Sequence, residues 1–387
     1  MKASDFTDKR SGKIVSTIEG QLAFVPSDLP PELQWAPELI ACLSDADRSI
    51  GQLHGIGLNL PNPNLLITPF IRREAELSSR LEGTQANIEQ LYLFELEESS
   101  IESKVPDVRE VSNYVRALES GRQKLSELPV SLRLMRELHE ILLKDVRSEQ
   151  REPGQFRKIQ NWIGPEGTPI EQAGYVPPPP EQMLKALDSF ERFVNAPLGN
   201  LPVLVWLAMI HYQIEAIHPF LDGNGRIGRL LITLLLCAKD ILDKPLLYLS
   251  AYFERNRRQY YDLLLRVSTH GQWTEWIQFF LRGVIGQSKD AFNRARQLLD
   301  LQQQYHRIVH ATKKSALQIR LVDLLIERPV VTTVFVSRSL NVTYPAAKSN
   351  IKKLIKTGIL KEIPGIKRNK VFIAAKVLEV INKPFAT

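Results

Sequence analysis

The chain has 387 residues, of which 44% are hydrophobic, and its 50 Lys and Arg outnumber its 43 Asp and Glu. This composition supports two or three domains with packed cores and excludes an intrinsically disordered chain. The two cysteines, Cys42 and Cys237, exclude a disulfide scaffold, and the absence of a signal peptide or an apolar run of roughly 20 residues predicts a cytoplasmic protein without membrane contact.

Helical periodicity begins in the first quarter of the chain. Residues 37–51 carry a helical pattern, and a second one covers residues 71–90. In the second pattern, Ser78 and Glu82 are four residues apart and therefore share a helix face. Gly83 follows at a place where a helix can end. By itself, Glu82 has the pattern of an ordinary surface carboxylate.

Two further amphipathic helices are predicted before a loop-rich region. They cover residues 107–124 and 131–143, and His139 lies among apolar neighbours in the second, which favours a structural role. Glycines and a run of four prolines then interrupt the helical pattern between residues 153 and 180. Within this region, residues 156–163 and 173–176 predict a β-hairpin.

The densest group of reactive side chains lies at residues 218–229, which read His218-Pro219-Phe220-Leu221-Asp222-Gly223-Asn224-Gly225-Arg226-Ile227-Gly228-Arg229. Glycine allows positive φ and close approach of the backbone to a ligand. A helix that begins near Gly225 would direct its free N–H groups at the turn, which makes an anion site. Arg226 and Arg229 share a helix face, and each can bind phosphate through two N–H groups.

The remaining polar residues of this run suit phosphate chemistry. Asp222 is an oxygen ligand of the kind that Mg²⁺ uses together with substrate phosphates. His218 can accept a proton near neutral pH, so it can act as a general base toward an attacking hydroxyl. Each feature alone is common in turns and helix ends, but their order within apolar flanks favours a phosphate-handling site.

Beyond this run, Tyr252-Phe253 and Tyr260-Tyr261 lie on a helical stretch where aromatic side chains can form a wall for a base. We assign Tyr260 to this role, although tyrosines on a helix are more often core residues.

The C-terminal segment is strongly basic. Residues 313–387 hold 15 Lys and Arg and four Asp and Glu, so the remaining chain is slightly acidic. Helices are predicted over residues 315–327, 332–340 and 344–357, with Lys348, Lys352, Lys353 and Lys356 on the third. Residues 361–363 and 370–374 predict two short strands, joined through residues 364–368. This order resembles a winged helix-turn-helix, which binds DNA or packs against protein.

The run at 218–229 resembles the signature of Fic-domain proteins, His-Pro-Phe-x-Asp/Glu-Gly-Asn-Gly-Arg-x-x-Arg, and matches it at every fixed position. The resemblance implies a mainly α fold with a helical Fic core, and an enzyme that transfers AMP from ATP to a protein hydroxyl. It implies that His218 is the catalytic base and that Asp222 holds Mg²⁺. It implies an ATP site formed by Glu82, His218, Gly223, Asn224, Gly225, Arg226, Gly228 and Arg229, to which we add Tyr260.

Ser78 to Gly83 resembles the inhibitory motif Ser/Thr-x-x-x-Glu-Gly/Asn of Fic proteins that carry their own inhibitor. By that resemblance Glu82, with Ser78, pairs with Arg229 and keeps it from the γ-phosphate, so that ATP binds in an unproductive pose. Whether Glu82 also positions water for removal of AMP stays open.

The resemblance divides the chain into residues 1–105 as an N-terminal cap with the inhibitory helix, 106–295 as the Fic catalytic domain, and 313–387 as the winged helix-turn-helix domain. It implies that the predicted hairpin is a flap that docks the target by strand addition, and it adds a homodimer to test. DNA is the partner that the winged helix-turn-helix pattern of the C-terminal segment adds. The target and the modified residue, Tyr, Ser or Thr, stay open.

Two alternatives remain at this point. One is phosphate transfer of the Doc kind, against which Gly225 argues because Doc-like relatives carry a lysine near this position. The other is a DNA-binding regulator whose Fic fold only senses nucleotide.

Overall fold

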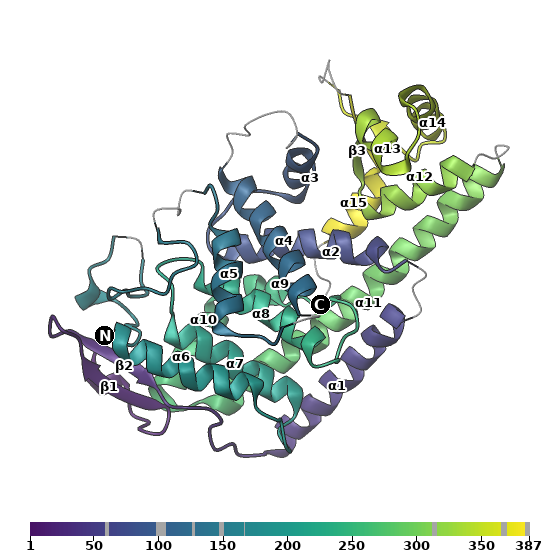
Figure 1. Ribbon diagram of the computed structural model, residues 1–387. Coiled ribbons are helices and arrows are strands. Elements are labelled where there is room, and N and C mark those ends of the chain that lie inside the picture. The colour runs from purple at the N-terminus through teal and green to yellow at the C-terminus, as the bar shows by residue number, and fades with distance from the viewer. Residues whose placement is uncertain are drawn as a thin grey trace.

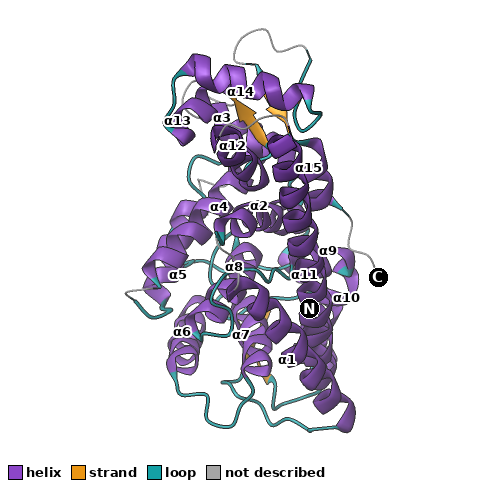
Figure 2. Ribbon diagram, turned by 90° about the vertical axis from the view of Figure 1, so that its right-hand side faces the viewer, coloured by secondary structure: helices purple, strands orange, loops and turns teal. Residues whose placement is uncertain are grey.

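The structure is a computed structural model that describes residues 1–58, 62–97, 106–125, 128–146, 151–165, 167–311, 316–364 and 370–383. Its described residues are mainly helical, which confirms the predicted fold class. The helices form an elongated body, and a smaller module made from the end of the chain sits at one end of it (Figures 1 and 2).

Three helices form the long axis and the centre of the body. Helix α11 (Trp273–Ala311) runs through both parts of the molecule, and α1 (Pro37–Leu58) packs along it (Figure 1). Helix α7 (Val203–Ile217) is apolar on nearly every face and is buried between α1, α8, α10 and α11. A helix that is hydrophobic all round requires such a central position.

The predicted helices of the first half are confirmed, except that the stretch at residues 71–90 is broken between residues 81 and 88. Residues 37–51 lie in α1, residues 71–90 divide between α2 and α3, and α4 and α5 cover the two amphipathic segments that follow. Ser131 caps α5 by accepting a hydrogen bond from the Leu134 N–H. The bounds of these and the other helices of the body are α2 (Asn64–Leu81), α3 (Ile88–Glu97), α4 (Pro106–Lys124), α5 (Leu132–Leu142), α6 (Pro180–Asn195), α8 (Asn224–Ala238), α9 (Ser250–Arg255), α10 (Arg257–His270) and the short 3-10 helices η1 (Ala3–Asp5) and η3 (Ile170–Gln172).

The predicted hairpin over residues 156–163 and 173–176 is wrong as a pair of strands. The described residues of this region form one antiparallel bridge, between Ile163 and Tyr175. The Val176 carbonyl instead accepts a hydrogen bond from Phe24 N–H, at 2.9 Å. Phe24 belongs to a hairpin that the sequence reading missed, in which β1 (Gly12–Ser16) pairs antiparallel with β2 (Leu22–Pro26). A backbone carbonyl that the predicted hairpin would have used within itself is thus hydrogen-bonded to β2.

The C-terminal module contains the predicted elements in the predicted order. Helices α12 (Ala316–Glu327), α13 (Thr333–Leu340) and α14 (Tyr344–Lys356) are followed by β4 (Lys361–Glu362) and β5 (Val371–Ile373). The sequence reading missed two elements, the strand β3 (Val330–Thr332) and the helix α15 (Ala375–Asn382). Strand β3 pairs with β5 in a three-stranded sheet of order β3-β5-β4. Residues 312–315 and the predicted connection at 365–369 lie outside the described residues.

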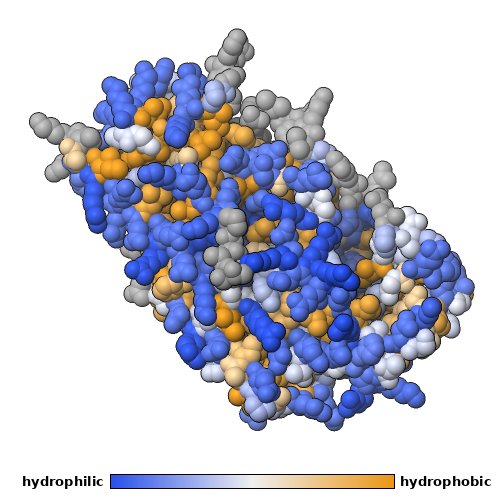
Figure 3. All heavy atoms as spheres, turned by 180° about the vertical axis from the view of Figure 1, so that it is seen from behind, coloured by the Kyte–Doolittle hydropathy of each residue, from blue (hydrophilic) through white to orange (hydrophobic). Residues whose placement is uncertain are grey.

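Helix α2 joins the two parts of the molecule. It packs against α4, α8 and α9 of the body and against α12 and α15 of the module. The rear face of the molecule in Figure 3 is largely hydrophilic over the body, and hydrophobic side chains gather toward the end that carries the module. Within the described residues, no helix combines the length and apolar character that a membrane span requires.

Candidate active site

The run from His218 to Arg229 forms the connection between α7 and α8. Helix α7 ends at Ile217, and His218 takes a left-handed conformation with φ 49° and ψ 61°. Gly223, with φ 77°, precedes the first residue of α8. A left-handed conformation is unfavourable for a residue with a side chain, so its occurrence at His218 indicates a site whose geometry the surrounding structure enforces.

Buried polar side chains hold this connection in place. Arg157, which is 2% exposed, donates from Nε to the His218 carbonyl at 2.9 Å. The His139 ring accepts from Gly154 N–H through Nδ1 and therefore donates from Nε2 to the Asp222 carbonyl, at 2.9 Å each. The structural role predicted for His139 is confirmed, whereas the role of Arg157 was missed.

Asn224 closes the connection from inside. Its amide accepts from Phe220 N–H and donates to the Phe220 carbonyl, both at 2.8 Å, and the residue is 3% exposed. The side chain thus shapes the loop. The backbone N–H of Asn224 lies in the first turn of α8, where the sequence predicted an anion site.

The His218 ring is arranged to accept a proton. Its Nδ1 lies 3.3 Å from the Glu215 carbonyl, and because a carbonyl can only accept, Nδ1 carries the hydrogen and Nε2 keeps its lone pair. Burial lowers the pKa of His218 to about 4. The ring is therefore neutral at physiological pH, which is the form that a general base requires.

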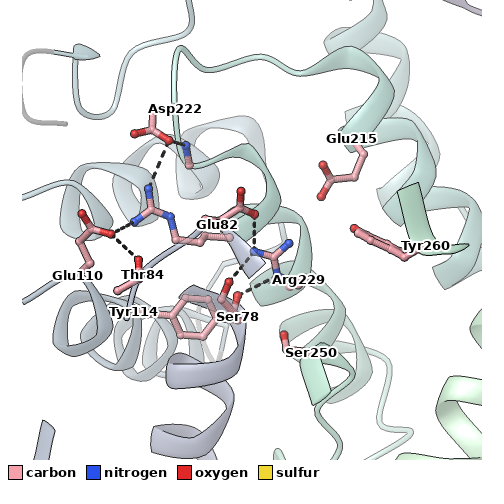
Figure 4. Close-up of polar contacts among 12 residues, drawn as sticks. Ser78, Glu82, Thr84, Glu110, Tyr114, Glu215, Asp222, Arg229, Ser250 and Tyr260 are labelled. Atoms are coloured by element: carbon pink, nitrogen blue, oxygen red, sulfur yellow. Dashed lines mark hydrogen bonds and ion pairs between the residues drawn. The ribbon is translucent and has the colours of Figure 1, made fainter. Parts of the chain in front are cut away.

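Ser78 and Glu82 meet Arg229, as predicted (Figure 4). Arg229 donates from Nε to Ser78 Oγ at 2.8 Å, and from Nη2 to the Ser78 carbonyl at 3.0 Å and to Glu82 Oε1 at 2.7 Å. The Arg229 side chain is 1% exposed and that of Glu82 is 33% exposed. Burial lowers the pKa of Arg229 while the Glu82 carboxylate raises it, and the net shift is upward, so the guanidinium stays charged.

Gly225 makes the approach of Glu82 possible. A Cβ atom on residue 225 would lie 2.3 Å from Glu82 Oε1, which is far inside van der Waals contact. Gly83, with φ 97°, ends α2 immediately after Glu82 and directs the chain away from the site.

Arg226 is held by a different set of carboxylates. Its Nη1 lies 3.4 Å from Glu110 Oε2 and its Nη2 lies 3.4 Å from Asp222 Oδ1. Glu110, on α4, also accepts a hydrogen bond from Thr84 at 3.0 Å, two residues beyond Glu82. Arg226 and Arg229 are thus paired with different carboxylates. The sequence reading missed Glu110 because α4 is distant from residues 218–229 in the chain.

A cavity of about 480 Å³ opens beside these residues. Of the predicted ATP-binding residues, four line it, namely Glu82, His218, Gly225 and Arg229. The remainder, Gly223, Asn224, Arg226, Gly228 and Tyr260, do not. The rest of the wall comes from the end of α2, from residues 162–164 and 174–175, and from α7 and α10.

Two residues of this cavity were not predicted. Tyr260 is fully buried, and its hydroxyl lies 2.8 Å from His211 Nε2. The prediction that Tyr260 lines the cavity is therefore wrong. Its neighbour Tyr261 lines the cavity and is 40% exposed. Glu215, one helical turn before His218, also lines the cavity. A lone acidic residue inside the apolar α7 was the signal that could have identified it.

Asp222 has the position expected of a Mg²⁺ ligand. Its side chain is 35% exposed, and Oδ1 accepts from Gly223 N–H at 2.6 Å. The described residues hold no group of three or more His, Cys, Asp or Glu side chains that would bind a metal by themselves. A single accessible carboxylate fits Mg²⁺, which takes most of its remaining ligands from substrate phosphates and water.

Helix α2 is anchored by a buried carboxyl one turn before Ser78. Glu74 is 2% exposed and accepts hydrogen bonds from Ser250 Oγ, from Ser250 N–H at 3.3 Å and from Tyr114 Oη at 3.2 Å. Burial raises the pKa of Glu74 to about 7. These contacts tie α2 to α4 and α9.

Comparison with known families and proteins agrees with this geometry. Residues 40–123 match the family described as Fic/DOC family N-terminal, and residues 129–236 match the Fic/DOC family. Among curated proteins, the protein adenylyltransferase Fic of Drosophila grimshawi is 30% identical over 156 residues, which are 40% of this chain and 29% of that protein. The protein of the same name from Drosophila erecta is 27% identical over 156 residues. The chain thus matches less than a third of the length of these relatives.

Solved structures show the same fold. A Fic family protein from Desulfovibrio desulfuricans G20 aligns with a TM-score of 0.58 at 18% identity, covering 89% of this chain and 98% of that one. Fic-1 of C. elegans aligns with a TM-score of 0.50 at 19% identity, covering 68% and 75%. This chain thus contains a region that matches the Fic/DOC family N-terminal model and a region that matches the Fic/DOC family model.

Proposed function

We propose that this protein is a self-inhibited adenylyltransferase that transfers AMP from ATP to a Tyr, Ser or Thr hydroxyl of a target protein, which can include itself. The observation that carries the proposal is the neutral His218 in a cavity that also presents Arg229. This combination supplies a base for a hydroxyl beside a cation for a phosphate chain.

In the proposed reaction the target hydroxyl attacks the α-phosphorus of ATP. Its proton passes to His218 Nε2, the new O–P bond forms, the bond from the α-phosphorus to the bridging oxygen breaks, and pyrophosphate leaves. The first turn of α8, after Gly223, directs its N–H groups at the phosphate chain. Arg229, once free of Glu82, and Arg226 bind outer phosphate oxygens through their guanidinium groups. Mg²⁺ held by Asp222 would neutralise charge on the phosphates.

Inhibition follows in this proposal from the Arg229 contacts. Glu82 and Ser78 together occupy its Nε and Nη2 atoms. A γ-phosphate that cannot use Arg229 leaves the nucleotide in a pose in which the α-phosphorus is not in line with the hydroxyl, and misalignment of this kind costs orders of magnitude in rate.

The test is intact-mass measurement after incubation with Mg²⁺ and ATP of the wild type, Glu82→Gly, and Glu82→Gly with His218→Ala. We expect a gain of one AMP group in Glu82→Gly, little in the wild type and none in the double variant. A gain of one phosphate would replace the proposal with the kinase alternative. If none of the proteins changes mass, the same three are assayed with a mixture of candidate protein acceptors and ³²P-labelled ATP in the α position, and absence of label there would overturn the proposal.

A second proposed function concerns the C-terminal module. We propose that residues 313–387 form a winged helix-turn-helix that binds DNA through α14. Support comes from the element order α12-β3-α13-α14-β4-β5 and from Lys348, Lys352, Lys353 and Lys356, all of which are exposed. Binding of a labelled duplex, measured by fluorescence anisotropy at two salt concentrations, tests this proposal.

A further inference from the structure

Glu215 is a buried acid without a partner that explains its burial. Its side chain is 12% exposed, and Oε1 is buried without a hydrogen-bond partner among the described residues. The nearest basic atom that pairs with it is His211 Nε2, at 4.0 Å. Burial lowers the pKa of His211 to about 3, so this histidine is neutral and the two residues do not form an ion pair.

The surrounding structure makes room for this acid. A Cβ atom on residue 228 would lie 2.6 Å from Glu215 Oε1 and 3.3 Å from His211 Cε1, so glycine at position 228 is what allows the carboxyl to take its place. A carboxyl that is buried without a hydrogen-bond partner costs free energy. Because no fold-stabilising contact compensates this cost at Oε1, Glu215 is a candidate for contact with a ligand.

The side chain faces the nucleotide cavity. Figure 4 shows Glu215 pointing from α7 toward the pair formed by Arg229 and Glu82. Its pKa responds to the same neighbours, because burial raises it to about 7 while Arg229 lowers it and Glu82 raises it. Glu215 therefore lies near the charged side chains of the cavity, whose wall also includes the apolar side chains of Trp162, Ile163 and Leu265.

The side chains that line the cavity indicate which part of a nucleotide meets Glu215. The apolar side chains suit a base, and Arg229 and His218 suit the phosphates. An acid cannot accept a hydrogen bond from phosphate oxygens, which carry negative charge and no hydrogen. The hydrogen-bond donors of ATP are the two ribose hydroxyls and the 6-amino group of adenine, and the ribose connects the base to the phosphates.

We propose that Glu215 is a specificity-determining residue of the cavity that accepts a hydrogen bond from a ribose hydroxyl of the nucleotide. This inference rests on the proposed function. It assigns to Glu215 the selection of ribonucleotides over deoxyribonucleotides, and it assigns to Gly228 the role of making space for that carboxyl.

The test compares Glu82→Gly with Glu82→Gly/Glu215→Ala and Glu82→Gly/Glu215→Gln. Equilibrium binding of ATP, 2′-deoxy-ATP, 3′-deoxy-ATP and purine riboside triphosphate, which lacks the 6-amino group, is measured by titration calorimetry with Mg²⁺ present. Asp188→Ala in the same background removes an exposed carboxylate of α6 and serves as the control. Thermal melts establish that each variant is folded.

With Glu215 present, we expect one of the two deoxynucleotides to bind roughly tenfold more weakly than ATP, as for a lost hydrogen bond to a charged acceptor. In Glu215→Ala, the binding of ATP weakens by the same factor and this discrimination disappears. Glu215→Gln keeps a carbonyl oxygen and retains most of the discrimination. If discrimination is unchanged in Glu215→Ala while ATP still binds, the inference is overturned and the proposed function stands. If Glu215→Ala loses only the discrimination between ATP and purine riboside triphosphate, the contact belongs to the 6-amino group and the ribose assignment is overturned. If Glu82→Gly binds no ATP, both are overturned.

Discussion

Glu82 Oε1 accepts a hydrogen bond from Arg229 Nη2 at 2.7 Å, across 147 residues of sequence. The contact brings the last turn of α2 onto the first turns of α8, where the phosphate site is proposed. Removal of the carboxylate should therefore free Arg229 without disturbing the rest of the site.

We expect Glu82→Gly to raise the initial rate of AMP transfer at least tenfold, because Arg229 then reaches the γ-phosphate and the α-phosphorus aligns with the hydroxyl. Radiolabel transfer from ATP labelled in the α position measures this rate. Ser78→Ala removes only the Arg229 Nε contact, so its increase should be smaller. Equal rates in wild type and Glu82→Gly would show that the contact does not inhibit.

His218 gives a second prediction, concerning pH. Because its pKa is lowered to about 4, the ring stays neutral and basic from pH 8 down to about 5, and protonation should not reduce the rate in this range. In Glu82→Gly/Glu215→Gln, which removes the other cavity group whose pKa is raised to about 7, kcat/KM should therefore show no fall with an apparent pKa near 6.5 as the pH decreases. A fall with that midpoint would indicate an ordinary exposed histidine in the active form. His218→Ala should lose transfer but keep ATP binding in calorimetry.

Glu74 links the anchoring of α2 to pH. Its pKa is raised by burial from 4.5 to about 7, so the folded protein holds a proton that the unfolded chain releases between these values. The stability that this group contributes is present below pH 4.5 and is lost as the pH rises to about 7, by up to about 3 kcal/mol. Urea denaturation at pH 5 and pH 7.5 measures the loss.

In Glu74→Gln the free energy of unfolding should vary less between these two pH values than in the wild type. Glu181→Gln, at the exposed start of α6, should leave the difference unchanged. Glu215, whose pKa is also raised to about 7, adds a contribution of the same sign in both proteins. An unaltered pH dependence in Glu74→Gln would contradict the prediction.

Glu95 connects the inhibitory helix to the C-terminal module. It lies 3.0 Å from Arg72 of α2 and 2.9 Å from Arg328 after α12, and its side chain is 11% exposed while that of Arg72 is 3% exposed. Glu95→Ala leaves a buried arginine without its carboxylate, and we expect a loss of about 3 kcal/mol in unfolding free energy. Asp45→Ala breaks the exposed pair with Arg48 and should cost less than about 1 kcal/mol. Similar losses in the two variants would show that the Glu95 contacts are solvated in solution.

The C-terminal lysines give a prediction about salt. If α14 contacts DNA phosphates, the logarithm of the binding constant should fall steeply with the logarithm of salt concentration, and each contacting lysine changed to alanine should reduce the slope by about one. Lys352→Ala and Lys356→Ala test this, with Lys185→Ala on α6 of the body as a control. Binding that does not respond to salt, or slopes that the lysine variants leave unchanged, would contradict DNA contact through α14.

The local sequence determined much of this protein. The apolar periodicity of residues 107–124 and 131–143 was sufficient to predict α4 and α5, because a helix that buries one face repeats its apolar residues every three to four positions. The spacing of His218, Gly223 and Arg229 likewise places a base, a turn and a cation in one short segment. This motif could be recognised without knowing which residues lie near it in the folded protein.

Contacts between distant segments were decided by the tertiary structure. Residues 156–163 and 173–176 read as a pair of strands, yet they form one bridge, between Ile163 and Tyr175, and the Val176 carbonyl accepts a hydrogen bond from Phe24 N–H of β2. Tyr260 and Tyr261 are adjacent and chemically alike, so only the rotation of α10 about its axis decides which of them is buried and which faces the cavity. The meeting of Glu110 with Arg226 depends on how α4 packs against α8, and helix packing is fixed by the shapes of whole surfaces and not by the residues of either segment alone.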